Sequence, residues 1–192
     1  QDNSRFMKAL LSRIRRNLSY LFFAWRTGAS LRDKLKLAWK LDKGIAVRRG
    51  LAAYTGKPER ISALCNGRRF DVTLRDNATD IIIFEDLFNQ RCYDLGDRRF
   101  TSIVDAGANI GLASLYFSLA HPGSSIASFE PVEHATCRQN AAQVFDFALG
   151  SQSGHFDILL DPNNSGGHRL ACYDSDAALQ KIQVPVRRLD EL

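Results

Sequence analysis

Two glycines and two carboxylates near the middle of the chain have the types and spacing of a nucleotide-binding site. Gly107 and Gly111 follow an apolar run that carries Asp105, and Glu130 ends a second apolar run about 20 residues later. Glycine allows a sharp turn after a strand and lets a ligand approach bare backbone, while the free N–H groups of a helix start favour an anionic group. A carboxylate ending the second strand can accept hydrogen bonds from both hydroxyls of a ribose.

These side chains require a strand, a glycine turn, a helix and a second strand in that order. Gly111 is expected in the first turn of the helix, where a side chain would push the helix away from the sheet. The next helix would leave no loop before the third strand, so either a segment is missing from the sequence or the connection is a compact variant. The expected elements are strands starting at Ser102 and over 125–129, 144–148, 155–160 and 182–189, helices over 109–119 and 133–143, and a turn over 163–167.

Asn109 decides which nucleotide the turn would accept. It stands where the dinucleotide fingerprint G-x-G-x-x-G has its second glycine, and its side chain would crowd a pyrophosphate. S-adenosylmethionine carries no phosphate and would fit, and Asp105 could accept a hydrogen bond from its ammonium group or act through water. An NAD(P)-dependent oxidoreductase is one alternative, and a non-catalytic binding module with the same fold is another.

The stretch from Val104 to Gly111, followed by Phe129-Glu130-Pro131, resembles the FkbM-type family of S-adenosylmethionine-dependent methyltransferases. The resemblance covers roughly residues 70 to 190 and implies a Rossmann-like class I α/β fold with S-adenosyl-L-methionine as cofactor. It also implies O-methylation of a hydroxyl on a sugar, polyketide or similar metabolite, a small-molecule or glycan acceptor. Further stretches agree with the family at 77–88, 148–154, 164–167 and 186–190.

The resemblance and the residue types together predict a set of cofactor-binding residues. Asp146 could accept from the exocyclic amine of adenine and Phe147 could stack on its ring, or they are a solvated carboxylate and a core aromatic side chain. We expect Glu130→Ala to weaken cofactor binding with little change in stability. The predicted residues are Asp105, Ala106, Gly107, Ala108, Asn109, Gly111, Glu130, Pro131, Asp146 and Phe147.

The family would continue beyond Leu192 into a fourth parallel strand, so the methyltransferase domain is expected to be truncated there. A three-stranded half sheet would otherwise leave a long exposed edge, which proteins avoid. Residues that orient the acceptor would lie in the missing part, and no catalytic base is named.

Charge divides the chain into a basic and an acidic part. Residues 1–70 hold 17 Lys and Arg against 4 Asp and Glu, whereas residues 71–192 hold 9 against 17. We therefore expect a basic helical extension over 1–58 before a methyltransferase domain over 59–192. The basic part could attract an anionic partner, or it could pack against the acidic domain or a second subunit.

Within the basic part, periodicity predicts helices over 4–25, from Ser30 and over 44–55, then a β-hairpin turning at Asn66-Gly67. Thr79 is expected to cap a further helix that runs to about Asn89. The first helix carries an apolar stripe, which could pack on the rest of the protein or make peripheral membrane contact through residues 1–50. No stretch approaches the ~20 apolar residues of a membrane-spanning helix.

Cysteine and histidine spacing argues against a metal site. The four cysteines include no C-x-x-C pair, and the four histidines are isolated, so neither zinc nor a dense disulfide framework is expected. A reducing, cytoplasmic setting is the simplest, with membrane association left open. No base-flipping motif is present, so nucleic acid is not the expected acceptor, and the sequence leaves the oligomeric state open.

Overall fold

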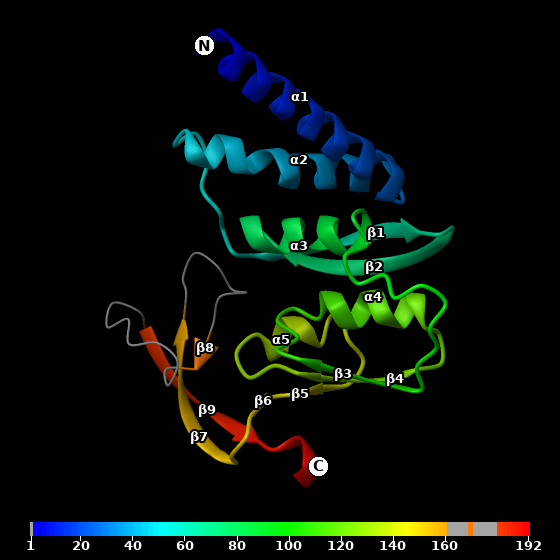
Figure 1. The fold of residues 1–192 in the computed structure, drawn as a ribbon, viewed down its shortest axis with the longest axis vertical. Helices are drawn as coiled ribbons and strands as arrows, with labels where there is room; N and C mark the ends of the chain where they lie inside the picture. The colour runs from blue at the N-terminus through cyan, green and yellow to red at the C-terminus, as the bar shows by residue number, and fades with distance from the viewer. Residues whose placement is uncertain (1, 161–168, 171–179) are drawn as a thin grey trace. The chain divides into compact units, whose positions relative to one another are not determined.

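The computed structural model describes residues 2–160, 169–170 and 180–192, which divide into two compact units, Gln1–Glu85 and Asp86–Leu192 (Figure 1). The first unit holds α1 (Asp2–Thr27), α2 (Leu31–Arg48), β1 (Pro58–Cys65), β2 (Arg68–Arg75) and most of α3 (Ala78–Phe88). The second holds β3 (Ser102–Ala106), α4 (Leu112–Ala120), β4 (Ser125–Phe129), α5 (His134–Cys137), β5 (Val144–Phe145), β6 (Ala148–Leu149), β7 (Gly154–Leu160), β8 (Arg169–Leu170), β9 (Gln180–Arg187) and a 3-10 turn, η3 (Leu189–Glu191).

The two long helices of the first unit lie where the sequence predicts them, with α1 two residues longer at each end than the predicted 4–25. α1 ends one residue before Gly28, and Ser30 caps α2, because the Asp33 N–H donates to Ser30 Oγ at 3.2 Å. The Ser30 hydroxyl in turn donates to the Asp33 carboxylate at 2.5 Å. The predicted start of this helix at Ser30 is therefore confirmed.

The predicted third helix over 44–55 is wrong. α2 continues through Gly44 to Arg48, and the segment after it is not helical. Asp76 fixes that segment, because the backbone N–H and the hydroxyl of Thr55 both donate to its carboxylate, at 2.9 and 2.8 Å. Hydrogen bonds to a distant residue thus replace those that a local helix would make.

The β-hairpin forms as expected, with β1 and β2 antiparallel around a tight turn. Asn66 and Gly67 both have positive φ, 50° and 77°, as a type I′ turn requires. The hairpin packs with the helices before it, and the Ala29 N–H donates to the Ser62 carbonyl at 3.0 Å. The first compact unit therefore extends to Glu85, beyond the boundary expected near residue 58.

The start of α3 differs from the expectation by one cap. Asn77, rather than Thr79, caps the helix, because its Oδ1 accepts from the Asp80 N–H at 2.8 Å. The Asp80 side chain is fully buried and accepts two hydrogen bonds from the Arg75 guanidinium, at 3.0 and 2.8 Å. Asp80 therefore holds the end of β2 rather than being free to contact a ligand.

The second unit contains the parallel sheet that the sequence predicts. β3 pairs with β4 and β4 with β5, all parallel, in the order β3-β4-β5. α4 and α5 lie over the same face of this sheet (Figure 1). A mixed α/β unit with a parallel sheet is compatible with a methyltransferase-like fold.

Three expected elements of this unit are shorter than predicted. The helix expected from residue 109 begins at Leu112, because Asn109 and Gly111 take positive φ values of 51° and 82°. The helix expected over 133–143 spans only His134–Cys137, which leaves residues 138–143 for the connection to β5. The strand expected over 144–148 divides into β5 and β6, which belong to different sheets.

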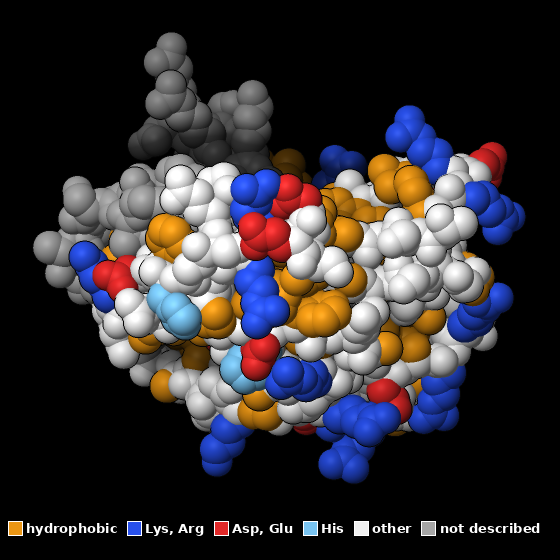
Figure 2. Space-filling view, turned by 90° about the horizontal axis from the view of Figure 1, so that it is seen from below, with side chains coloured by type: hydrophobic (Ala, Val, Ile, Leu, Met, Phe, Trp, Pro, Cys, Tyr) orange, Lys and Arg blue, Asp and Glu red, His pale blue; other side chains and the backbone are white. Residues whose placement is uncertain are grey.

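A second, mixed sheet ends the described chain, in the order β6-β9-β7-β8. β7 and β9 are antiparallel, as the two predicted strands allow, and Ile158, Val184 and Val186 are buried between them and their neighbours. The turn expected over 163–167 lies outside the described residues, as do His168 and Cys172. Figure 2 shows one face of the molecule, on which hydrophobic side chains form small groups separated by polar atoms.

Gly111 offers a test of the packing around the glycine turn. A Cβ built there would lie 3.0 Å from the Cys137 carbonyl oxygen and 3.2 Å from the Ala141 Cβ, so the close contact is with the segment after β4, not with the sheet. Gly107, with φ 80°, is the matched control, because a Cβ there would meet nothing within 4 Å.

We expect Gly107→Ala to destabilise the full-length protein by about 1 kcal/mol, from the left-handed backbone alone. Gly111→Ala should cost a further ~1–3 kcal/mol, because overpacking is added to the same backbone cost. Urea unfolding of both variants measures the difference. Equal destabilisation would show that the segment around Cys137 does not pack against the turn.

Candidate functional site

The turn after β3 is bonded to the end of β4. The N–H groups of Gly107 and Ala108 both donate to the Phe129 carbonyl, at 2.9 and 3.0 Å. Gly107, Asn109 and Gly111 all have positive φ, which bends the chain from the strand into α4 within five residues. The turn therefore lies directly beside Glu130, the residue after β4, and the structure brings these predicted residues together.

Glu130 is the best-connected side chain of this region. It is only 6 % exposed, and its Oε2 accepts from the Asn109 N–H at 2.8 Å. Its Oε1 accepts from the N–H groups of Val132 and Glu133, at 2.8 and 3.0 Å. One carboxylate thus fixes both the turn after β3 and the turn after β4.

These bonds change what Glu130 can offer a ligand. A carboxylate has about four acceptor positions, and three backbone N–H groups use three of them. Oε2, which accepts a single bond, keeps room for one further donor. Sequence reasoning expected two ribose hydroxyls at this side chain, and the second would have to displace the Asn109 N–H.

Asp105 begins a chain of hydrogen bonds that continues through two serine hydroxyls. Its Oδ2 accepts from the Ser114 hydroxyl at 2.5 Å, and Ser114 Oγ lies 2.7 Å from Ser128 Oγ. Burial raises the pKa of Asp105, while the Ser114 hydroxyl acts in the opposite direction. The Ser114 backbone N–H also bonds to this carboxylate, and Asp105 is half-buried, so part of the carboxylate stays open to a donor from outside.

Sequence reasoning missed both serines. Ser114 and Ser128 are buried, at 2 % and 0 % exposure, and lie on α4 and β4. Ser128 could have been found from the strand pairing, because Asp105 and Ser128 face each other in the parallel register of β3 and β4. Ser114 depends on where α4 begins, which the sequence placed three residues too early.

The segment after β4 packs against the glycine turn that follows β3. The Asn140 side-chain amide donates to the Ile110 carbonyl at 2.7 Å, and Cys137 is fully buried against Gly111. Burial, with the nearby charges of Glu130 and Asp105, raises the pKa of Cys137 to about 12. The Cys137 thiol is therefore protonated at neutral pH and is a packing residue rather than a nucleophile.

Phe147 is placed as a core aromatic residue. It is 6 % exposed, and its ring centroid lies 5.3 Å from that of Phe129 and 5.7 Å from that of Phe145. The Arg187 guanidinium lies 4.7 Å from the centre of its ring. An adenine would thus have to share Phe147 with these neighbours, while Asp146 beside it is exposed.

The remaining predicted residues occupy the ends of the two strands. Ala106 is exposed at the end of β3, Ala108 is buried in the turn, and Pro131 follows Glu130 and is half-buried. Among the described residues, no group of three or more His, Cys, Asp and Glu side chains is placed to hold a metal ion. No described helix is long and apolar enough to cross a membrane.

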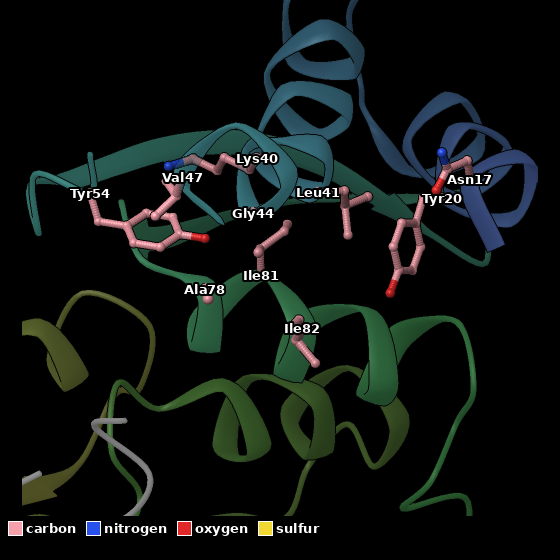
Figure 3. Close-up of a pocket in the computed structure, with 10 residues that line it drawn as sticks. All are labelled: Asn17, Tyr20, Lys40, Leu41, Gly44, Val47, Tyr54, Ala78, Ile81 and Ile82. Carbon is pink, nitrogen blue, oxygen red and sulfur yellow. The ribbon is translucent and has the colours of Figure 1, made fainter. Parts of the chain in front are cut away.

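A separate cavity lies within the first unit. It has a volume of about 400 Å³ and lies between α1, α2, the Tyr54 segment and α3, with Tyr20, Lys40 and Tyr54 among its lining residues (Figure 3). None of the predicted cofactor-binding residues lines this cavity. The glycine turn and this cavity are therefore distinct candidates for ligand binding.

Comparison with known proteins relates about half of the chain to methyltransferases. The chain is 33% identical over 99 residues to Methyltransferase sdnD of Sordaria araneosa, covering 46% of the chain and 38% of that protein. It is 29% identical over 112 residues to Methyltransferase 1 of Beauveria bassiana, covering 52% and 44%. It is 36% identical over 102 residues to the 31-O-demethyl-FK506 methyltransferase FkbM of Streptomyces tacrolimicus, covering 50% and 36%.

The chain thus spans less than half the length of each of these relatives. No protein-family model matches it, and no solved structure matches it significantly.

The bonds of Glu130 predict a structural effect that the sequence did not suggest. Glu130→Ala removes the acceptor of three backbone N–H groups, so we expect a loss of about 2–4 kcal/mol in the free energy of unfolding. Glu130→Gln keeps one carbonyl oxygen and should lose less. Thermal and urea unfolding of the full-length protein without ligand measures both, and an unchanged Glu130→Ala protein would contradict the bracing role.

Proposed function

We propose that the second unit forms the cofactor-binding part of an S-adenosylmethionine-dependent methyltransferase. The observation that carries the proposal is the link between the glycine turn after β3 and the carboxylate after β4, made by the Asn109 N–H and Glu130 Oε2 at 2.8 Å. The similarity of about half of the chain to proteins named methyltransferases supports it.

The residues present fit this cofactor in three respects. The space beside Gly107 is open, since a Cβ there would meet nothing within 4 Å. Oε2 of Glu130 has room for one ribose hydroxyl, and the half-buried carboxylate of Asp105 can accept from the ammonium of the amino-acid tail. The cofactor lacks phosphates, so the side chain of Asn109 need not give way to a pyrophosphate.

The chemistry divides between the cofactor and the chain. When bound, the cofactor supplies a methyl group already activated by its sulfonium. The chain binds and orients: the turn after β3 gives bare backbone, Glu130 fixes the ribose, and Asp105 fixes the charged tail. Holding the methyl group in line with an incoming oxygen is where most of the rate gain of such a reaction arises.

For the acceptor we propose a hydroxyl on a sugar, polyketide or similar metabolite. The support is the resemblance to the FkbM-type family and a matched relative whose name makes it a methyltransferase of 31-O-demethyl-FK506.

Asp105→Asn separates binding from stability. The amide oxygen can still accept from Ser114, and the variant removes a charge whose burial is unfavourable, so stability at neutral pH should hold or rise. Affinity for S-adenosylhomocysteine should fall about 10- to 100-fold, the value of one charge-assisted hydrogen bond. Calorimetric titration measures this, with Asp157→Asn on β7, an exposed carboxylate, as the matched control. Wild-type affinity in Asp105→Asn would remove Asp105 from the site.

The raised pKa of Asp105 also predicts a pH dependence. Because its carboxyl protonates at a higher pH than an ordinary aspartate, the ionised form that attracts the ammonium is lost early on acidification. Affinity of the wild-type protein should therefore start to fall above the usual aspartate range. The Asp105→Asn protein should not show this fall. NAD(P) titrated in parallel should not bind, and tight NAD(P) binding without S-adenosylhomocysteine binding would overturn the proposed function.

A further inference from the structure

The helices α1 and α2 bury some apolar side chains, such as Phe23 and Leu37, and leave many others exposed. Eight large residues of the two helices are between 56 % and 65 % exposed, and six of them are Leu18, Leu21, Phe22, Trp25, Leu35 and Trp39. On α1 they recur at three- and four-residue spacing and on α2 at four-residue spacing, so each helix carries a stripe. We call these six residues the apolar face.

The opposite side of α2 is buried and carries two lysines as well as Leu37. Lys40 and Lys43 are 7 % and 8 % exposed, and their ammonium groups lie 3.3 Å from Glu59 and 2.6 Å from Asp76. A helix on a protein surface normally places its apolar stripe inward and its lysines in water. Here ion pairs hold two lysines of α2 inward beside Leu37, while the apolar face stays outside the core of the first unit.

The two stripes form one surface. Leu21 of α1 and Leu35 and Trp39 of α2 line a single groove with a volume of about 490 Å³. Cations border the apolar face. Lys34 Nζ lies 4.3 Å from the centre of the Trp25 ring, and the Arg26 guanidinium lies 5.9 Å from that of Phe22. Tryptophan and leucine beside lysine and arginine are the composition of helices that lie at a membrane interface.

Charge selects the partner. Residues 1–50 carry 13 Lys and Arg against 3 Asp and Glu. A second copy of the chain would bring two strongly basic surfaces together, whereas an anionic bilayer offers negative charge and an apolar layer a few ångströms below it. We propose that α1 and α2 bind the surface of an anionic phospholipid membrane through the apolar face, with the flanking cations on lipid phosphates. This inference is independent of the proposed function.

The tryptophans give a direct readout. The chain has two, Trp25 and Trp39, and both belong to the apolar face. We expect the tryptophan emission of the full-length protein to shift to the blue when vesicles of phosphatidylcholine mixed with phosphatidylglycerol are added, because the rings leave water. Vesicles of phosphatidylcholine alone should give little shift, and added salt should weaken binding to the anionic vesicles.

Variants test whether the apolar face carries the binding. Leu35→Ala combined with Trp39→Ala should reduce partition onto anionic vesicles on the order of 10-fold or more, measured by co-flotation. Leu189→Ala, which truncates an apolar residue 52 % exposed on η3, is the matched control and should bind as wild type. Unliganded melting temperatures check that each variant folds.

Three results would overturn the inference. One is failure of the wild-type protein to float with anionic vesicles. Another is undiminished binding by the double variant, since charge alone would then suffice. The third is a dimer, seen by light scattering, that the same double variant dissolves, because the apolar face would then join two copies of the chain.

Discussion

The geometry of the glycine turn depends on one buried carboxylate. A carboxylate buried away from water is costly unless it accepts hydrogen bonds. Glu130 accepts them from backbone N–H groups of the turn after β3 and of the turn after β4. The turn after β3 and the turn after β4 therefore cannot move independently. A ligand entering here meets donors and acceptors that are already placed, which limits the reorganisation that binding would cost.

A carboxylate at the end of a strand can therefore stabilise the fold as well as bind a ligand. Glu130 supports the fold with three hydrogen bonds before any ligand arrives, and Asp105 accepts a hydrogen bond from the Ser114 hydroxyl. A variant at either position alters both the site and its support. Stability and affinity must therefore be measured side by side to separate the two roles.

The sequence predicted well where local chemistry decides the structure. Asn66-Gly67 specifies its hairpin because few other residues accept the φ values of that turn, and Ser30 caps α2 through atoms three residues away. It also placed Gly107 beside Glu130, since parallel strands bring their carboxyl ends to one edge. These features depend on neighbours in sequence or on a simple strand order.

It failed where distant residues compete with local preference. The sequence predicts a third helix over 44–55, but the carboxylate of Asp76, which follows β2, accepts hydrogen bonds from Thr55 and holds that segment out of a helix. The expected helix over 133–143 fails for a related reason. The chain must reach β5 at Val144, where it pairs with β4, so the helix stops after one turn to leave residues for the connection. Periodicity carries no information about the length of that connection.

The same limit applies to α1 and α2, with a larger consequence. Periodicity identifies an apolar stripe, but it cannot say which side of the helix is covered. Glu59 and Asp76 contribute to that choice, because their ion pairs hold Lys40 and Lys43 on the inside, beside the buried Leu37. Because a buried lysine without its carboxylate would be strongly unfavourable, reversing α2 to hide Trp39 would require breaking these pairs. These ion pairs therefore help to keep the apolar face exposed, and any partner of that face binds a surface that they help to hold in place.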